Sequence, residues 1–178
     1  ETNLAAADQA TDTPTNNFAT LNPLDNYWCN GALSQGNCRL ITTSAEYGYI
    51  TGTLGASSGK WYWEMFMEDP VDTTNYVATG IAGRAPVSTE GIGYETNGVA
   101  YQGNDGKSRN ENTISTYGDS YTTNDIIGVA MDLDNSKLYF SKNNTWQNSG
   151  DPTSGATGTG AISIDAANTT VDGFYRPA

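Results

Sequence analysis

Histidine is absent from this chain of 178 residues. Its absence removes the side chain most often used as a general base and as a ligand of transition metals. Catalytic arrangements of the Ser-His-Asp and Cys-His types are therefore excluded. Cysteine is nearly absent as well, since Cys29 and Cys38 are the only two. The chain thus offers too few nitrogen and sulfur ligands for a zinc site.

Charged residues and long apolar runs are also scarce. Only 16% of the residues are charged, which is low for a helical protein, and no segment keeps a 3.6-residue apolar period. No run approaches the roughly 18–20 apolar residues of a membrane helix. Acidic residues outnumber basic ones by 20 to 8, which gives a net charge of −12. We therefore expect neither nucleic acid nor a membrane as a partner.

Glycine, tyrosine, threonine, serine and asparagine are abundant, and this composition favours strands and turns. Many short strand candidates separated by turn residues predict an all-β fold, an antiparallel β-sandwich of two sheets. Besides two segments described next, we expect strands over residues 27–33, 37–43, 47–54, 75–82, 98–102, 161–165 and 171–175. Residues 109–120 and 143–160 are expected to be loops, and 104–107 a tight turn.

The central feature of the chain is a predicted hairpin over residues 125–142. Its apolar residues alternate with small, acidic or polar ones, the period of a half-buried strand. Asp134, Asn135 and Ser136 separate the two strands and are typical of a hairpin turn. The residues expected to face the core are Ile127, Val129, Met131, Leu133, Leu138 and Phe140.

A second alternating segment, residues 58–69, is rich in aromatic residues. Trp61, Trp63, Met65 and Met67 would share one face of a strand. Because tryptophan brings the largest apolar area of any residue, we expect this strand to anchor the core. The other face would carry Tyr62, Glu64, Phe66 and Glu68.

The N-terminal residues 1–13 are polar, and they predict an extended arm. Such an arm becomes ordered only by packing on something, such as a neighbouring subunit. The chain does not begin with methionine and shows no signal peptide, so we expect a processed N-terminus or one internal to a longer product. Residues 14–178 form the predicted sandwich.

Four motifs occur in a characteristic order along this sandwich. They are Ser58-Gly59-Lys60-Trp61-Tyr62-Trp63-Glu64, Thr79-Gly80-Ile81-Ala82, residues 125–135 (DIIGVAMDLDN) and residues 138–143 (LYFSKN). Together they resemble a SPRY domain, the concanavalin-A-like jelly roll also found in B30.2 modules. The resemblance implies a two-sheet antiparallel sandwich over residues 14–178.

A narrower similarity, in residues 12–23 and 146–155, is to SPRY-containing tail or virion proteins of tailed bacteriophages. It implies a binding or structural role at an extracellular or virion surface. One departure matters: in the family pattern a closing strand follows a segment like Phe174–Ala178, where this sequence stops. The resemblance therefore implies that the closing strand lies outside this sequence or comes from another chain, with the arm as a candidate donor.

Five aromatic residues fall in or beside predicted loops: Tyr94, Tyr101, Tyr117, Tyr121 and Trp146. Exposed aromatic residues on the loops of a sandwich bind sugars by stacking or proteins by hot-spot packing. The alternative is that these rings cover the core. Both interpretations stay open at this point.

Acidic residues suggest two further sites. Glu64 and Glu68 share a strand face, but a rise of about 3.3 Å per residue puts them near 13 Å apart, too far for a glycosidase pair without a bend. Asp132 and Asp134, with Asn135, offer oxygen ligands for calcium, although hairpin-turn hydrogen bonding also explains them. Calcium is the only cofactor that the sequence suggests.

Two covalent modifications are also suggested. A disulfide between Cys29 and Cys38 would close a loop of about ten residues and would point to an oxidising compartment. The alternative is two reduced, buried thiols. Asn143 and Asn168 match the glycosylation acceptor pattern, a match that is usually accidental in bacterial or phage proteins.

These observations favour a non-enzymatic subunit of an extracellular assembly, such as a phage tail or fibre component or a filament subunit. It would act by self-association, as a homo-oligomer or with filament neighbours, and by recognition through its loops. The alternative is a monomeric module, cut from a longer adhesin or tail fibre, that binds a glycan or protein receptor. A glycosidase that uses Glu64 is a remote third hypothesis.

Overall fold

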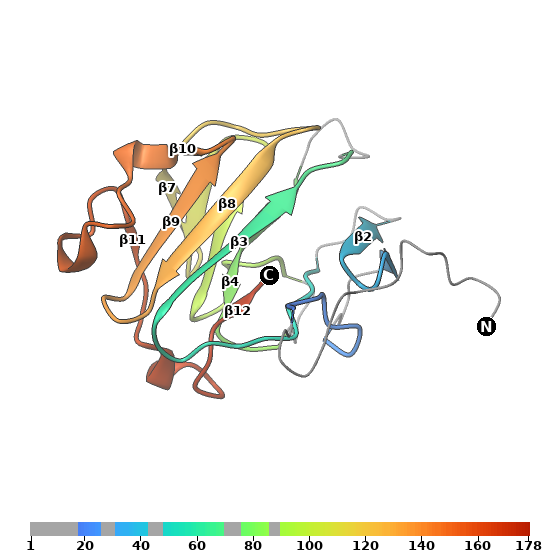
Figure 1. The fold of residues 1–178 in the computed structure, drawn as a ribbon, viewed down its shortest axis with the longest axis horizontal. Coiled ribbons are helices and arrows are strands. Elements are labelled where there is room, and N and C mark those ends of the chain that lie inside the picture. Colours follow the sequence, from blue (N-terminus) through green and yellow to red (C-terminus); the bar gives the residue numbers. More distant parts are fainter. Residues whose placement is uncertain (1–17, 26–30, 43–47, 70–75, 86–89) are drawn as a thin grey trace.

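The computed structural model describes residues 18–25, 31–42, 48–69, 76–85 and 90–178. These residues form strands and short 3-10 turns, and they include no helix with the length and apolarity needed to cross a membrane. All strand pairs are antiparallel, and the two larger sheets lie face to face (Figure 1). The prediction of an all-β, two-sheet antiparallel sandwich is confirmed.

The first sheet has the order β10-β9-β8-β3, and β11 pairs with the other half of β9. Its strands are β3 (Lys60–Phe66), β8 (Ile126–Asp132), β9 (Lys137–Lys142), β10 (Thr145–Trp146) and β11 (Ile162–Ser163). The second sheet has the order β12-β4-β5-β6-β7. Its strands are β4 (Ala78–Ala82), β5 (Gly98–Gln102), β6 (Lys107–Asn110), β7 (Thr113–Thr116) and β12 (Arg176–Pro177).

Three short 3-10 turns and one separate hairpin complete the described chain. The turns are η2 (Gln147–Ser149), η3 (Gly155–Thr157) and η4 (Ala167–Thr169). The hairpin consists of β1 (Gly31–Ser34) and β2 (Arg39–Thr42) and lies beside the sandwich (Figure 1). Arg39 connects it to the end of β3 through an ion pair of 2.6 Å with Glu68.

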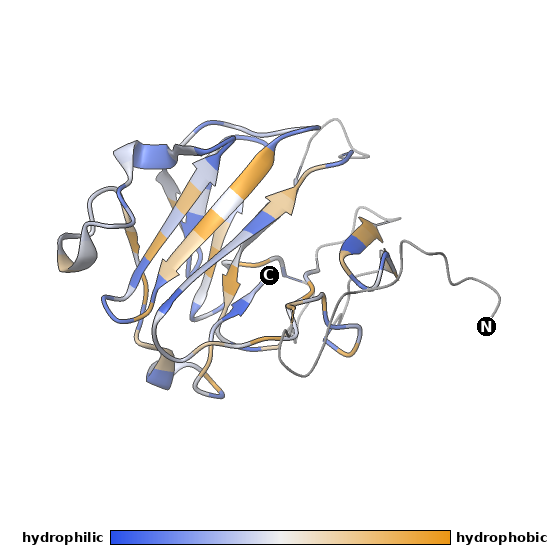
Figure 2. Cartoon of the chain, viewed as in Figure 1, coloured by the Kyte–Doolittle hydropathy of each residue, from blue (hydrophilic) through white to orange (hydrophobic). Residues whose placement is uncertain are grey.

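The predicted central hairpin is confirmed as β8 and β9. Val129 pairs with Phe140 and Met131 with Leu138, and all four side chains are at most 2% exposed. The turn uses the chemistry expected of it, because the Asp132 carboxylate accepts a hydrogen bond of 3.1 Å from the Asn135 amide. Figure 2 shows the apolar residues of this sheet alternating with more polar ones along its strands.

The prediction that the strand over residues 58–69 anchors the core holds for Met67, which is buried in the core, and for Trp63 and Met65, which pack against it, but not for Trp61. β3 has the predicted facing, because Trp63 pairs with Val129, but it is the last strand of its sheet among the described residues. Trp61 is therefore 48% exposed, and Trp63 is only partly buried. The core is instead centred on Tyr101, whose ring lies 5.1–5.6 Å from those of Tyr117, Tyr121 and Phe140.

Several predicted boundaries need correction. Residues 109–120, expected to be a loop, hold the end of β6 and all of β7, a polar strand without an apolar alternation that the sequence could reveal. Residues 143–160, expected to be one long loop, include β10, η2 and η3. Residues 48–54 carry only an isolated bridge from Gly52 to Leu21, and the last strand begins at Arg176, after the predicted segment.

The segment after which a closing strand is expected forms β12 at the edge of the second sheet, beside β4. Arg176 pairs with Ala82 and Pro177 with Ile81. On the other side, the Gly52 amide donates a hydrogen bond of 2.8 Å to the Pro177 carbonyl. A closing strand that follows this segment, or one donated by another chain, stays a prediction. The arm over residues 1–13 lies outside the described residues, so its role stays a prediction.

Candidate functional site

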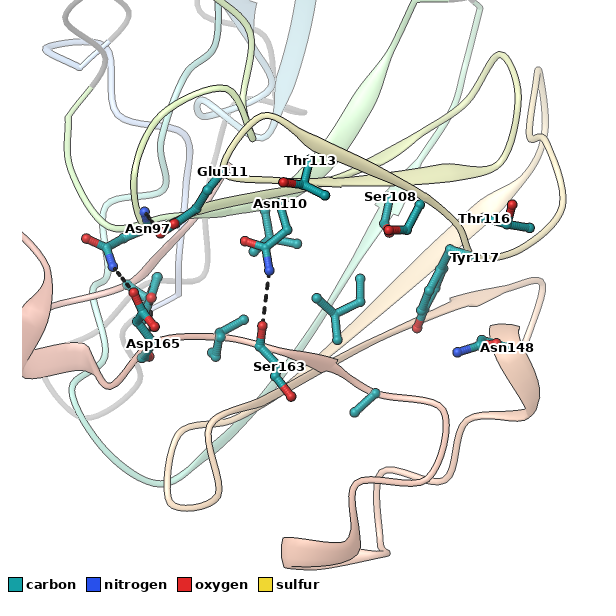
Figure 3. Close-up of a pocket in the computed structure, with 16 residues that line it drawn as sticks. Asn97, Ser108, Asn110, Glu111, Thr113, Thr116, Tyr117, Asn148, Ser163 and Asp165 are labelled. Carbon is teal, nitrogen blue, oxygen red and sulfur yellow. Dashed lines mark hydrogen bonds between the residues drawn. The ribbon is translucent and has the colours of Figure 1, made fainter.

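A polar cleft opens between the two sheets where their edges part. The inner face of β6 and β7 forms its floor, and the segment 161–165, which contains β11, forms the opposite wall (Figure 3). The cleft has a volume of about 490 Å³. β11 has only two paired residues, so it does not cover β6 and β7 as β9 covers β5, where the Phe140 ring stacks on the Tyr101 ring.

The floor of the cleft is a row of hydroxyl and amide groups. Ser108 pairs with Ser115, and Asn110 pairs with Thr113, so all four side chains share one face of the sheet. On the neighbouring strand β5, Val99 and Tyr101 lie on this same face. Ser108 is 4% exposed, yet its hydroxyl has no hydrogen-bond partner among the described residues. The floor therefore presents unused hydrogen-bonding groups to a ligand.

Few direct bonds cross the cleft. The Asn110 side chain donates a hydrogen bond of 3.1 Å to the Ser163 carbonyl, and the Asn97 side chain donates one of 3.3 Å to the Asp165 carboxylate. Figure 3 shows both bonds, with Asn97, Glu111 and Asp165 at one end of the cleft and Tyr117 and Asn148 at the other. The floor and the opposite wall are thus joined at two points, and the cleft is open between them.

The end of the cleft around Asn97 is acidic. The Glu111 carboxylate accepts a hydrogen bond of 2.8 Å from the Asn97 backbone amide, so both carboxylates meet at this residue. Burial raises the pKa of Tyr175 to about 12, and the nearby negative charges of Asp165 and Glu111 add to the rise. No lysine, arginine or cysteine is among the sixteen residues that line the cleft.

This set of side chains can form many hydrogen bonds. Carboxylates and amide oxygens accept them, and hydroxyls and amide nitrogens donate them. Among the described residues, no hydroxyl of the lining is hydrogen-bonded to a carboxylate of the lining. The cleft can therefore recognise a ligand that supplies hydrogen-bond donors.

Three of the five predicted aromatic residues do not form an exposed platform. Tyr101, Tyr117 and Tyr121 are at most 5% exposed and belong to the core. The Tyr117 hydroxyl accepts a hydrogen bond of 3.0 Å from the Phe140 amide, and the Tyr121 hydroxyl donates one of 2.8 Å to the Tyr101 carbonyl. The alternative interpretation, rings that cover the core, describes these three.

The other two aromatic residues are half-buried. Trp146 lies on the outer face of the first sheet, where its ring meets those of Tyr62 at 6.4 Å and Tyr139 at 6.5 Å edge-on. The Arg109 guanidinium lies 3.9 Å from the centre of the Tyr94 ring. A binding role for Trp146 and Tyr94 stays a prediction.

A second exposed surface, which we call the β3 strip, follows the edge of the first sheet. Its apolar residues are 38–54% exposed, and they are Trp61, Tyr62, Phe66 and Ile126. The Tyr62 ring lies over Gly128, where a Cβ atom would come within 2.6 Å of its hydroxyl. Tyr62, Phe66 and Ile126 lie on the outer face and Trp61 on the inner face of this edge, and exposed large apolar side chains are typical of an interaction surface.

The acidic residues considered for catalysis or calcium binding have protein partners. Glu64 accepts a hydrogen bond of 2.7 Å from the Tyr62 hydroxyl, and Glu68 pairs with Arg39. The Asp132 carboxylate is bound by Lys60 and Asn135, and Asp134 accepts a bond of 2.8 Å from the Gly59 amide. Burial alone would raise the pKa of Asp132, but hydrogen bonds from Lys60 and Asn135 outweigh it and lower that pKa.

Within the described ranges, no group of three or more acidic or cysteine residues could hold a metal ion. Cys38 is exposed, and Cys29 lies outside the described residues, so the disulfide stays a prediction. Asn143 is exposed, but its amide nitrogen donates to Asp125 and its amide oxygen accepts from Ile126. Asn168 lies exposed in η4. Glycosylation at either asparagine stays a prediction.

The sequence did not predict the cleft. Its floor comes from Ser108, Asn110, Thr113 and Ser115, which read as loop composition. The available signal was the alternation of Ser108 and Asn110 with Lys107 and Arg109, a period of two in purely polar residues. Such a pattern shows a strand but not which face is inward, because neither set is apolar.

Comparisons with known proteins agree with this fold. The chain is 29% identical over 123 residues to the ATP-dependent RNA helicase DDX1 of Xenopus laevis, a match that covers 69% of this chain and 16% of the helicase. The crystal structure of the SPRY domain of human HERC1 superimposes with a TM-score of 0.64 at 19% identity, covering 88% of this chain and 86% of that domain. The sequence profile of the SPRY domain matches residues 60–162, more than half of the chain. This chain therefore belongs to the SPRY domain family.

Proposed function

We propose that this chain is a non-enzymatic protein-binding module and that an extended segment of its partner enters the cleft between β6–β7 and β11. SPRY domains are typically protein-interaction modules, which supports a protein as the partner. The observation that carries the site is the polar floor: Ser108, Thr113 and Ser115 present hydroxyls to the cleft, and no described residue bonds to them. These hydroxyls are open to the solvent in the cleft, so a ligand can replace water as their hydrogen-bond partner.

The shape of the cleft also favours an extended segment. Its volume of about 490 Å³ lies within the range of roughly 300–1,000 Å³ that holds drug-sized ligands or short peptide segments. Hydroxyls both donate and accept hydrogen bonds, so they can pair with the alternating amides and carbonyls of a backbone. A flat protein surface would not reach a floor on which Ser108 is 4% exposed.

Selection of peptides tests this proposal. The immobilised chain is used to select from a random library of linear peptides, and the enriched peptides are measured by calorimetry. We expect Ser115→Trp, which fills the cleft from the exposed inner face of β7, to weaken binding at least tenfold. Ile114→Trp is the matched control, because Ile114 lies on the opposite face of the same strand and is 50% exposed. No enrichment over empty beads, or equal binding by Ser115→Trp, would contradict the proposal.

The β3 strip supports a second function, self-association, which the sequence-based prediction of an assembly subunit requires. Two copies can pair edge to edge around a two-fold axis through Glu64. Lys60 would then lie opposite Glu68 of the partner subunit, and Tyr62 opposite Phe66 of the partner subunit. The two Glu64 carboxylates would face each other at the axis, where like charges oppose pairing.

This arrangement makes a directional prediction. Glu64→Gln should lower the concentration at which dimers form in light scattering coupled to size exclusion, and Phe66→Lys should abolish them. A monomer at all concentrations in wild type and in Glu64→Gln would rule out this function. Glycan recognition and an extracellular or virion location rest on the sequence alone. Glycan-array binding and co-purification with virus particles are the measurements that test them.

A further inference from the structure

The acidic end of the cleft has a chemistry that the proposed function does not specify. We propose that Glu111 and Asp165 together bind the side chain of an arginine or lysine on the partner's extended segment. The inference rests on the proposed function, because it names the residue that this segment brings to the cleft.

The two carboxylates are held in place but are not fully used. Asn97 is 6% exposed and donates its backbone amide to Glu111 and its side-chain amide to Asp165. These bonds use one oxygen of each carboxylate, and no described residue donates to the other oxygen. Both side chains are exposed, and neither forms an ion pair among the described residues. Two anchored acceptors with free oxygens suit a guanidinium or ammonium group.

An independent feature points to a ligand in the same cleft, further along the floor from the two carboxylates (Figure 3). The Ser108 hydroxyl is aimed into the cleft from a nine-tenths buried position and lacks a partner among the described residues. Thr113 and Ser115 continue the same face with hydroxyls for which the described chain supplies no bond. A segment whose basic side chain reaches Glu111 and Asp165 would lay its backbone along these hydroxyls.

The lining disfavours anionic and glycan ligands. None of the chain's eight lysines and arginines lines the cleft, so phosphate, sulfate and nucleic acid would meet two carboxylates and no positive charge. Sugars commonly stack on an exposed aromatic face, but Tyr117 and Tyr175 are 5% and 1% exposed. The net charge of −12 would in addition attract a basic partner over a distance.

A pair of small probes tests the inference directly. Acetyl-arginine methylamide and acetyl-citrulline methylamide have nearly the same shape, but only the first carries a charge. We expect the arginine probe to shift the backbone amide signals of Asn97, Ser108 and Asn110 in two-dimensional NMR at millimolar concentration. The citrulline probe should shift them at least fivefold less. Glu111→Gln and Asp165→Asn keep an acceptor oxygen for Asn97, and each should weaken arginine binding at least threefold.

Asp119→Asn is the matched control, because it removes one exposed negative charge outside the cleft lining. It should leave the arginine response within experimental error of wild type. Equal responses to arginine and citrulline, or an equal loss in Asp119→Asn, would overturn the inference. Shifts caused by glucose or mannose in place of arginine would also overturn it, in favour of a glycan. If selected peptides still bind wild type and not Ser115→Trp in any of these cases, the proposed function stands while this inference fails.

Discussion

The inner face of the second sheet changes character from one strand to the next. On β5 it carries Val99 and Tyr101, which are at most 1% exposed and pack against the first sheet. On β6 and β7 it carries serine, threonine and asparagine, and the cleft opens above them. The two regions belong to one continuous sheet, so the backbone does not cause the difference. Closure depends on whether the opposite layer brings apolar partners, and β11 brings only two paired residues.

The largest effect that distinguishes the two regions should come from Tyr101. Tyr101→Ala removes a fully buried ring that contacts three other aromatic rings. We expect it to lower the free energy of unfolding by about 3–5 kcal/mol, the range for truncating a buried aromatic residue. Ser108→Ala, on the same face, should cost less than about 0.5 kcal/mol because its hydroxyl has no partner to lose. Urea unfolding measures both, and equal losses would mean that the two regions are packed alike.

The sequence predicted the apolar core of the sandwich better than the polar cleft. Val129, Met131, Leu138 and Phe140 alternate clearly, and all four lie in the core as expected. Trp61 was misjudged because composition does not reveal that its strand lies at a sheet edge, where no further strand covers it. The cleft was missed for a different reason. Ser108 and Ser115 have the composition of a loop, and only their pairing with each other makes them a floor.

A pH-dependent effect of intermediate size should come from Tyr117, a core residue that also borders one end of the cleft. Burial raises the pKa of Tyr117 to about 12, from 10 for an exposed tyrosine. A raised pKa in the folded state means that the stabilisation is complete below pH 10 and is lost as the pH rises toward 12. Two pKa units correspond to roughly 2–3 kcal/mol.

Tyr117→Phe should therefore lose about 1 kcal/mol at neutral pH, since the Phe140 amide loses its acceptor. Between pH 9 and pH 12, however, it should lose roughly 2–3 kcal/mol less than wild type, because one buried tyrosine no longer ionises. Urea unfolding at pH 9, 10, 11 and 12 gives the two curves. Parallel curves for wild type and Tyr117→Phe would show that the Tyr117 hydroxyl is hydrated and that burial does not raise its pKa.

A smaller effect should come from one of the two bonds that cross the cleft, the one donated by Asn110. The Asn110 side chain donates a hydrogen bond of 3.1 Å to the Ser163 carbonyl. The backbone amide of the next residue, Ile164, donates one of 3.1 Å to the Ser136 carbonyl. Asn110→Ala removes the first bond and should cost about 1 kcal/mol. Because β11 has only two paired residues, we expect the loss to appear as local opening, with amide hydrogen exchange at Ile164 accelerated about fivefold. Thr113→Ala is the control, since Thr113 pairs with Asn110 on the same face but makes no bond across the cleft. If exchange at Ile164 rises equally in both variants, packing and not this hydrogen bond holds β11 against the floor of the cleft. The cleft would then resemble the packed core over β5 more than its polar side chains indicate.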